Sequence, residues 1–122
     1  MTWIAVAVGG ALGSMARHGV NVLFAHRLLR AEPYGIATVN LLGSLAIGLL
    51  AGLIASGRLN LSPEVRTFVF VGVLGGFTTF SSLMLDTLTL IHGGRHAAAF
   101  ANAAGQLLVG YAAIYVGFRL GS

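Results

Sequence analysis

Polar side chains are scarce in this chain, and the few that interrupt its apolar stretches are the candidates for function. Asn102 and Gln106 lie four residues apart, so on a helix they share one face as a pair of amides. Asn40 stands alone in another apolar stretch. Amide pairs of this kind either join helices or line a polar path. A cation carrier would be expected to place a carboxylate deep in such a stretch, and these two stretches have none. Because amides and hydroxyls can donate hydrogen bonds to an anion, the pattern favours a small anion as the species that passes.

Two ionisable side chains fall inside apolar stretches, where a charge is expensive and therefore suggests function. Arg17 is the deepest cation. It either attracts an anion into a vestibule or extends its charge to the membrane interface. Asp86 is the acidic residue inside a stretch. It lies near the end of its stretch and is interpreted as an interfacial carboxylate.

The segment 75–82 combines two adjacent glycines with a run of hydroxyl and aromatic residues. This composition predicts a helix broken between Gly75 and Thr79. An irregular backbone inside a membrane must be buried by protein or line a wet cavity. Broken helices also form ion sites from their freed carbonyls and helix ends. The alternative is a glycine-rich packing face whose Ser and Thr hydroxyls bond back to the helix.

The elements that must position these groups are apolar helices. The chain has 122 residues, a mean hydropathy of +0.89 and only 8% charged residues, against about 25% in soluble domains. A bilayer core needs roughly 20 apolar residues per helix. The sequence therefore predicts an all-α integral membrane protein, with residues 1–122 forming a single domain of four transmembrane helices, the third broken mid-membrane. The expected spans are about 3–25, 34–55, 65–91 and 97–118.

Catalysis and nucleic-acid binding are both excluded by the pattern of charges. The three carboxylates are widely separated, so no acid pair is available for acid–base chemistry. The seven basic residues are all arginines and form no stripe that nucleic acid would follow. The chain is therefore not expected to be an enzyme, and the predicted work is the passage of something small.

The arginines of the loops do not favour one orientation in the membrane. One side of the four predicted spans carries Arg58, Arg66 and Arg119, and the other carries Arg27, Arg30 and Arg95. The positive-inside rule assigns the cytoplasmic side from an excess of Lys and Arg in the loops on one side, and the two sides here carry equal numbers. This balance predicts insertion in both orientations and hence an antiparallel dimer.

Three ordered motifs resemble the Fluc (CrcB) family of fluoride channels along nearly the whole chain. They are Gly-Gly-Ala-Leu-Gly-Ser-Met-Ala-Arg at 9–17, Gly-Ile-Ala-Thr-Val-Asn-Leu-Leu-Gly at 35–43 and Gly-Gly-Phe-Thr-Thr-Phe-Ser at 75–81. The resemblance implies a dual-topology antiparallel homodimer in the bacterial inner membrane. It also implies two pores and passive export of cytoplasmic fluoride.

The resemblance further assigns roles to individual residues. A structural Na⁺ at the dimer interface is expected on the backbone carbonyls of Gly75 and Thr78. Asp86 falls where the family often has an acidic residue near a pore mouth, and Arg17, the candidate vestibule charge, is the last residue of the first motif. The residues expected to line the pore are Asn40, Thr79, Phe80, Ser81, Asn102 and Gln106.

Leu83 departs from the family pattern, which commonly has a second Phe at this position. Leucine has no electropositive ring edge to offer an anion. The departure allows a pore with altered anion contacts, a weak pore, or a non-conducting subunit that works with a diverged partner. A small proton-coupled multidrug carrier is a further alternative, although the expected first span lacks the carboxylate that such a carrier needs.

Overall fold

The computed structural model describes residues 1–27 and 33–122, without the side chains of His26 and Arg27. Within these ranges the chain is helical and contains no strand. Arg30 and the side chain of Arg27, which entered the prediction from loop charge, lie outside the described residues.

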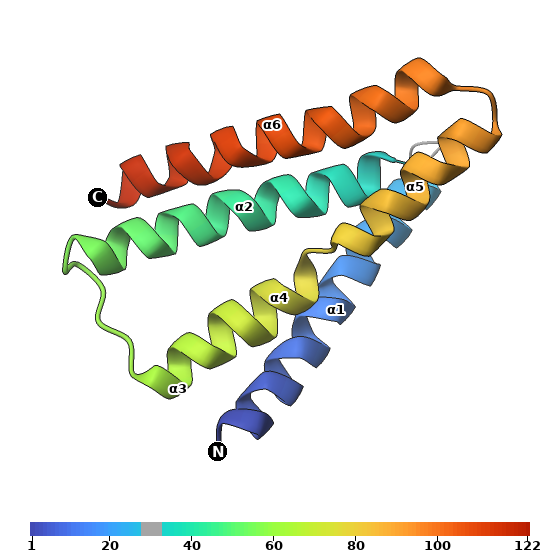
Figure 1. The fold of residues 1–122 in the computed structure, drawn as a ribbon. Helices are drawn as coiled ribbons and strands as arrows, with labels where there is room; N and C mark the ends of the chain where they lie inside the picture. Colours follow the sequence, from blue (N-terminus) through green and yellow to red (C-terminus); the bar gives the residue numbers. More distant parts are fainter. Residues whose placement is uncertain (28–32) are drawn as a thin grey trace.

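Three long helices and one interrupted helical segment make up the described chain (Figure 1). The long helices are α1 (Thr2–Arg27), α2 (Tyr34–Ala55) and α6 (His96–Gly121). The interrupted segment consists of α3 (Pro63–Arg66), the π-helix η1 (Thr67–Leu74), α4 (Gly75–Phe77) and α5 (Phe80–His92).

Local signals set the ends of these elements. Ser62 caps α3 by accepting a hydrogen bond of 3.3 Å from the Val65 amide, and Pro63 stands at the first helical position. Gly57 after α2 and Gly94 after α5 have φ angles of 75° and 73°. This left-handed conformation favours glycine, so both helices end in tight turns.

Among the described residues, three segments are long and apolar enough to cross a membrane: Tyr34–Ala55, Pro63–His92 and His96–Gly121. The first predicted span, 3–25, falls on α1, which is 26 residues long but is not among these three. Arg17, His18 and Asn21 lower its hydropathy.

The helices associate as two pairs through glycines (Figure 1). In the pair of α2 and α6, a Cβ added at Gly48 would overlap the Ile114 carbonyl, and one added at Gly117 would overlap the Leu45 carbonyl. In the other pair, α1 packs along η1 and α4, and a Cβ at Gly13 would overlap the Val73 carbonyl. The glycine pairs Gly9/Gly13, Gly48/Gly52 and Gly72/Gly76 all lie at such close approaches, as expected for small residues between membrane helices.

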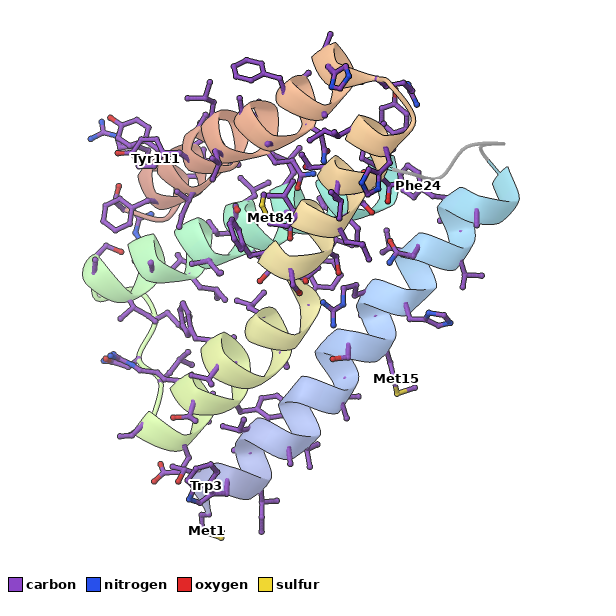
Figure 2. All side chains as sticks on the ribbon, turned by 45° about the vertical axis from the view of Figure 1, so that its right-hand side comes forward. Met1, Trp3, Met15, Phe24, Met84 and Tyr111 are labelled. Carbon is purple, nitrogen blue, oxygen red and sulfur yellow. The ribbon has the colours of Figure 1, made fainter. Side chains whose placement is uncertain are left out.

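The two pairs diverge toward the C-terminal end of α2 (Figure 1). An open cleft of about 450 Å³ lies between them there, lined by Ala55 of α2 and by Arg66 and Phe70 of the opposite pair. The outer faces are also apolar: Met15 on α1 is 70% exposed and Tyr111 on α6 is 73% exposed, both pointing away from the helices (Figure 2). Apolar surface on this scale requires lipid or another protein chain to cover it.

Candidate ion pathway at the interrupted helix

The backbone leaves the helical conformation at two residues between α4 and α5. Thr78 has φ −81° and ψ 155°, and Thr79 has φ −155° and ψ 122°, so both are extended. The helix resumes at Phe80. An interruption of this kind frees backbone N–H and C=O groups that must find other partners away from water.

Asn40 supplies those partners for Thr79. Its Oδ1 atom accepts a hydrogen bond of 2.9 Å from the Thr79 amide, and its Nδ2 atom donates one of 3.1 Å to the Thr79 carbonyl. A single side chain from α2 therefore satisfies both backbone groups of Thr79, 39 residues away in the sequence. An asparagine amide suits this task because it carries a donor and an acceptor side by side.

Side-chain hydrogen bonds continue from Asn40 across α6 to α5. Asn40 Nδ2 donates to Gln106 Oε1 at 2.8 Å, and Gln106 Nε2 donates to Asn102 Oδ1 at 2.8 Å. Asn102 Nδ2 then donates to Thr87 Oγ1 at 3.0 Å, and Thr87 Oγ1 donates to the Leu83 carbonyl at 2.8 Å. We call this series the amide relay.

Hydroxyl groups gather at the start of α5. Thr79 Oγ1 caps the helix by accepting a hydrogen bond of 3.3 Å from the Ser82 amide. The same oxygen lies 3.2 Å from Ser82 Oγ and 3.3 Å from Ser81 Oγ. The first turn of α5 thus presents hydroxyls beside a helix N-terminus, whose partial positive charge favours anions.

Two cavities adjoin the amide relay. The break cavity, of about 270 Å³, is lined by Thr78, Thr79, Phe80 and Leu83 around the interruption and by Ser44 of α2. The end cavity, of about 400 Å³, lies between α2 and α6 and is lined by residues that include Tyr34, Arg95 and Asn102. Asn40 and Gln106 line both cavities.

Comparison with known proteins identifies the family. The model of the family described as "CrcB-like protein, Camphor Resistance (CrcB)" matches residues 4–118. The chain belongs to the CrcB family. A CrcB relative from Paracoccus denitrificans is 47% identical over 121 residues, with 98% of this chain and 94% of that protein covered. A relative from Thermus thermophilus is 46% identical over 119 residues, with the same two shares covered. Both relatives are named fluoride-specific ion channel FluC.

With its apolar helices, this CrcB-family chain is a multi-pass membrane protein. The structure brings together five of the six residues expected to line a pore: Asn40, Thr79, Phe80, Asn102 and Gln106 all line at least one of the two cavities. Ser81 is exposed and reaches the site through its contact with Thr79 Oγ1.

The two charged residues singled out from the CrcB-family sequence lie apart from these cavities. Arg17 is half-buried on α1, and Asp86 is buried on α5 at 8% exposure. Neither lines the break cavity or the end cavity. Arg95, which entered the sequence analysis only as a loop charge, is the arginine that lines the end cavity.

Leu83 and Phe80 differ sharply in exposure. Leu83 is 3% exposed and lies inside the chain, whereas Phe80 is 66% exposed on its surface. Sequence reasoning missed Thr87, which accepts a hydrogen bond from Asn102, and gave no role to Ser82 within the segment 75–82, although its amide donates to Thr79 Oγ1. Helical spacing was the available signal for Thr87, because it follows Leu83 by four residues on the same face of α5.

Proposed function

We propose that this CrcB-family protein is a passive fluoride channel of the bacterial inner membrane, which lets cytoplasmic fluoride leave the cell. The observation that carries the proposal is the chemistry of the two cavities: their walls combine amide and hydroxyl groups from Asn40, Gln106, Asn102 and Thr79. Amide and hydroxyl hydrogens can replace the water around a small anion. The relatives named as fluoride-specific ion channels support the same conclusion.

Charge at the end cavity favours an anion as well. The Arg95 side chain lies in its wall, beside Tyr34. A fixed positive charge at the mouth of a low-dielectric cavity raises the local concentration of anions and speeds their entry. In this proposal fluoride moves between the end cavity and the break cavity, past Asn40 and Gln106.

The proposed assembly is an antiparallel homodimer in which α1 also crosses the membrane and the interruption lies mid-membrane. The open cleft between the two helix pairs and the 66% exposure of Phe80 support this assembly. A phenylalanine that is this exposed in its own chain needs a second chain to complete the wall around an anion at its ring edge. A second copy in the opposite orientation supplies that wall.

The proposed structural Na⁺ fits the carbonyls that the interruption frees. In a continuous helix the Gly75 carbonyl would bond the Thr79 amide, and the Thr78 carbonyl would bond the Ser82 amide. Here the Thr79 amide donates to Asn40 Oδ1, and the Ser82 amide donates to Thr79 Oγ1. The carbonyls of Gly75 and Thr78 are therefore among those that lose their helical partners at the break, and oxygen atoms are the ligands that such a hard cation prefers.

Fluoride flux from liposomes tests the proposed function. We expect purified protein to release trapped fluoride passively and to retain chloride. A variant with Leu108→Met, at a side chain 71% exposed on α6, serves as the control and should conduct like the wild type. Equal release of both anions, or release of neither, would refute the proposal.

Removal of Na⁺ tests the structural cation separately. Replacing Na⁺ with a bulky organic cation should lower the flux and the fraction of dimer in detergent. An unchanged flux and an unchanged dimer after exhaustive removal of Na⁺ would refute the cation site while leaving the fluoride pathway in place.

A further inference from the structure

Fixed backbone groups determine the direction of every hydrogen bond in the amide relay. At one end the Thr79 amide can only donate, so Asn40 must turn its Oδ1 atom toward it. At the other end the Leu83 carbonyl can only accept, so the Thr87 hydroxyl donates to it and accepts from Asn102. Between these anchors, the only consistent arrangement turns Gln106 Oε1 toward Asn40 and Gln106 Nε2 toward Asn102.

This direction leaves Asn40 with no spare donor. An asparagine side chain has two N–H groups, and here one bonds the Thr79 carbonyl at 3.1 Å and the other bonds Gln106 Oε1 at 2.8 Å. An anion that accepts a hydrogen bond from Asn40 must therefore displace one of these two oxygens. The Thr79 carbonyl is part of the main chain between two helices, whereas Gln106 Oε1 lies at the end of a side chain with rotatable bonds, so Gln106 is the group that moves.

The same hydrogen bond lies where the two cavities meet. Asn40 belongs to α2 and Gln106 to α6, and both residues line the break cavity and the end cavity. A 2.8 Å contact between their side chains leaves no room for an ion to pass between them. Opening this contact joins the cavities and exposes one N–H of Asn40 at the same moment.

We propose that Gln106 is a gate whose Oε1 atom occupies the place of the permeating anion on Asn40. Fluoride passes by displacing this oxygen and accepting the N–H that it leaves. The Gln106 side chain turns aside while the ion is bound, and the relay closes again when the ion moves on. This proposal rests on the proposed fluoride channel and assigns Gln106 as a positioning and competing residue within it.

Gln106→Met tests the gate, because methionine keeps the length and much of the volume but lacks the amide oxygen. Without the competing oxygen, fluoride should bind more tightly, and the half-saturating fluoride concentration should fall by about 2- to 10-fold, the factor that one net hydrogen bond represents. The matched control introduces the same residue on the outer face of the same helix, as Leu108→Met, and should leave that concentration unchanged.

A measurement on the wild-type protein needs no substitution. The side-chain amide signals of Asn40 and Gln106 are followed by ¹⁵N NMR in detergent micelles during titration with fluoride and, separately, chloride. We expect the amide signals of both side chains to shift together during the fluoride titration, at the same midpoint concentration as the flux. Chloride should leave both signals unchanged.

The outcomes separate the gate from the channel. Wild-type fluoride flux combined with an unchanged or raised half-saturation in Gln106→Met overturns the gate alone. If the Asn40 amide signals do not shift at fluoride concentrations that saturate the flux, the gate is overturned, even if Gln106→Met does not fold. A wild-type protein that releases no fluoride overturns both proposals.

Discussion

Replacing Asn40 with leucine gives the most direct test of how the interrupted helix is held together. The substitution keeps the size of the side chain and removes three hydrogen bonds, two to the backbone of Thr79 and one to Gln106. The Thr79 amide and carbonyl would then face the apolar leucine side chain instead of a donor and an acceptor. We expect the Asn40→Leu protein to be less stable and its chain at Thr79 to open more often.

Two estimates of the magnitude agree. Side-chain hydrogen bonds between membrane helices average roughly 0.6 kcal/mol each, so three of them give about 2 kcal/mol. A buried backbone group left without a partner costs about 1–3 kcal/mol. Because the Asn40 site is only partly buried, the lower part of that range applies to each of the two groups. The free energy of unfolding should therefore fall by about 2–3 kcal/mol.

Unfolding in detergent, followed by circular dichroism, measures this change, and hydrogen exchange at the Thr79 amide locates it. Ser44→Ala is the control, because it removes a polar group from the same helix one turn further along and leaves Asn40 intact. The reasoning would be refuted by an Asn40→Leu protein as stable as the control, with its Thr79 amide still protected from exchange.

Three further predictions concern packing, topology and the family departure. Gly117→Ala places a methyl group against the Leu45 carbonyl and should destabilise the α2–α6 pair by about 1–3 kcal/mol, as measured by thermal unfolding. The control is Gly105→Ala on the same helix, where the added methyl group meets nothing within 4 Å and should leave thermal unfolding unchanged. The chain contains no cysteine, so a single cysteine introduced as Asn60→Cys in the loop before α3 reports orientation alone. An impermeant thiol reagent should label about half the molecules from each side of the membrane. Complete labelling from one side would contradict dual topology. The break cavity should accommodate Leu83→Phe with a change in the free energy of unfolding below about 1.5 kcal/mol. The added ring should raise fluoride flux relative to chloride flux. A fall in that ratio would contradict the idea that a second ring at position 83 improves fluoride selectivity.

Much of the secondary structure is predictable because it depends on local properties. The expected span 34–55 has the same bounds as α2, and the Ser62-Pro63 start and the glycine turn after α5 follow from capping and backbone conformation. Length and hydropathy suffice for these features, since a chain in lipid must bond its own backbone. The break expected between Gly75 and Thr79 is narrower in the structure, because Gly75–Phe77 form α4 and only Thr78 and Thr79 are extended.

The pairing of the helices and the contacts of the site are decided by the tertiary structure. The apolar stretches are hydrophobic all round, so their sequences do not reveal which face packs against which neighbour. The sequence therefore singles out Asn40, Asn102 and Gln106 without indicating that they bond one another or the main chain of Thr79. The direction of the hydrogen bonds in the amide relay depends on the backbone groups of Thr79 and Leu83, which only the folded chain brings to the two ends of the relay.

The amino-acid sequence alone thus determined an apolar, helical membrane protein and singled out a small set of amides and hydroxyls inside its apolar stretches. The tertiary structure decided which of those groups keep a hydrogen-bond donor that is not already used within the protein. Hydrogen bonding is the physical reason, because each amide has few donors and the folded chain has already assigned most of them. Asn40 is polar in the sequence, but in the structure both of its N–H groups are occupied, one of them by Gln106.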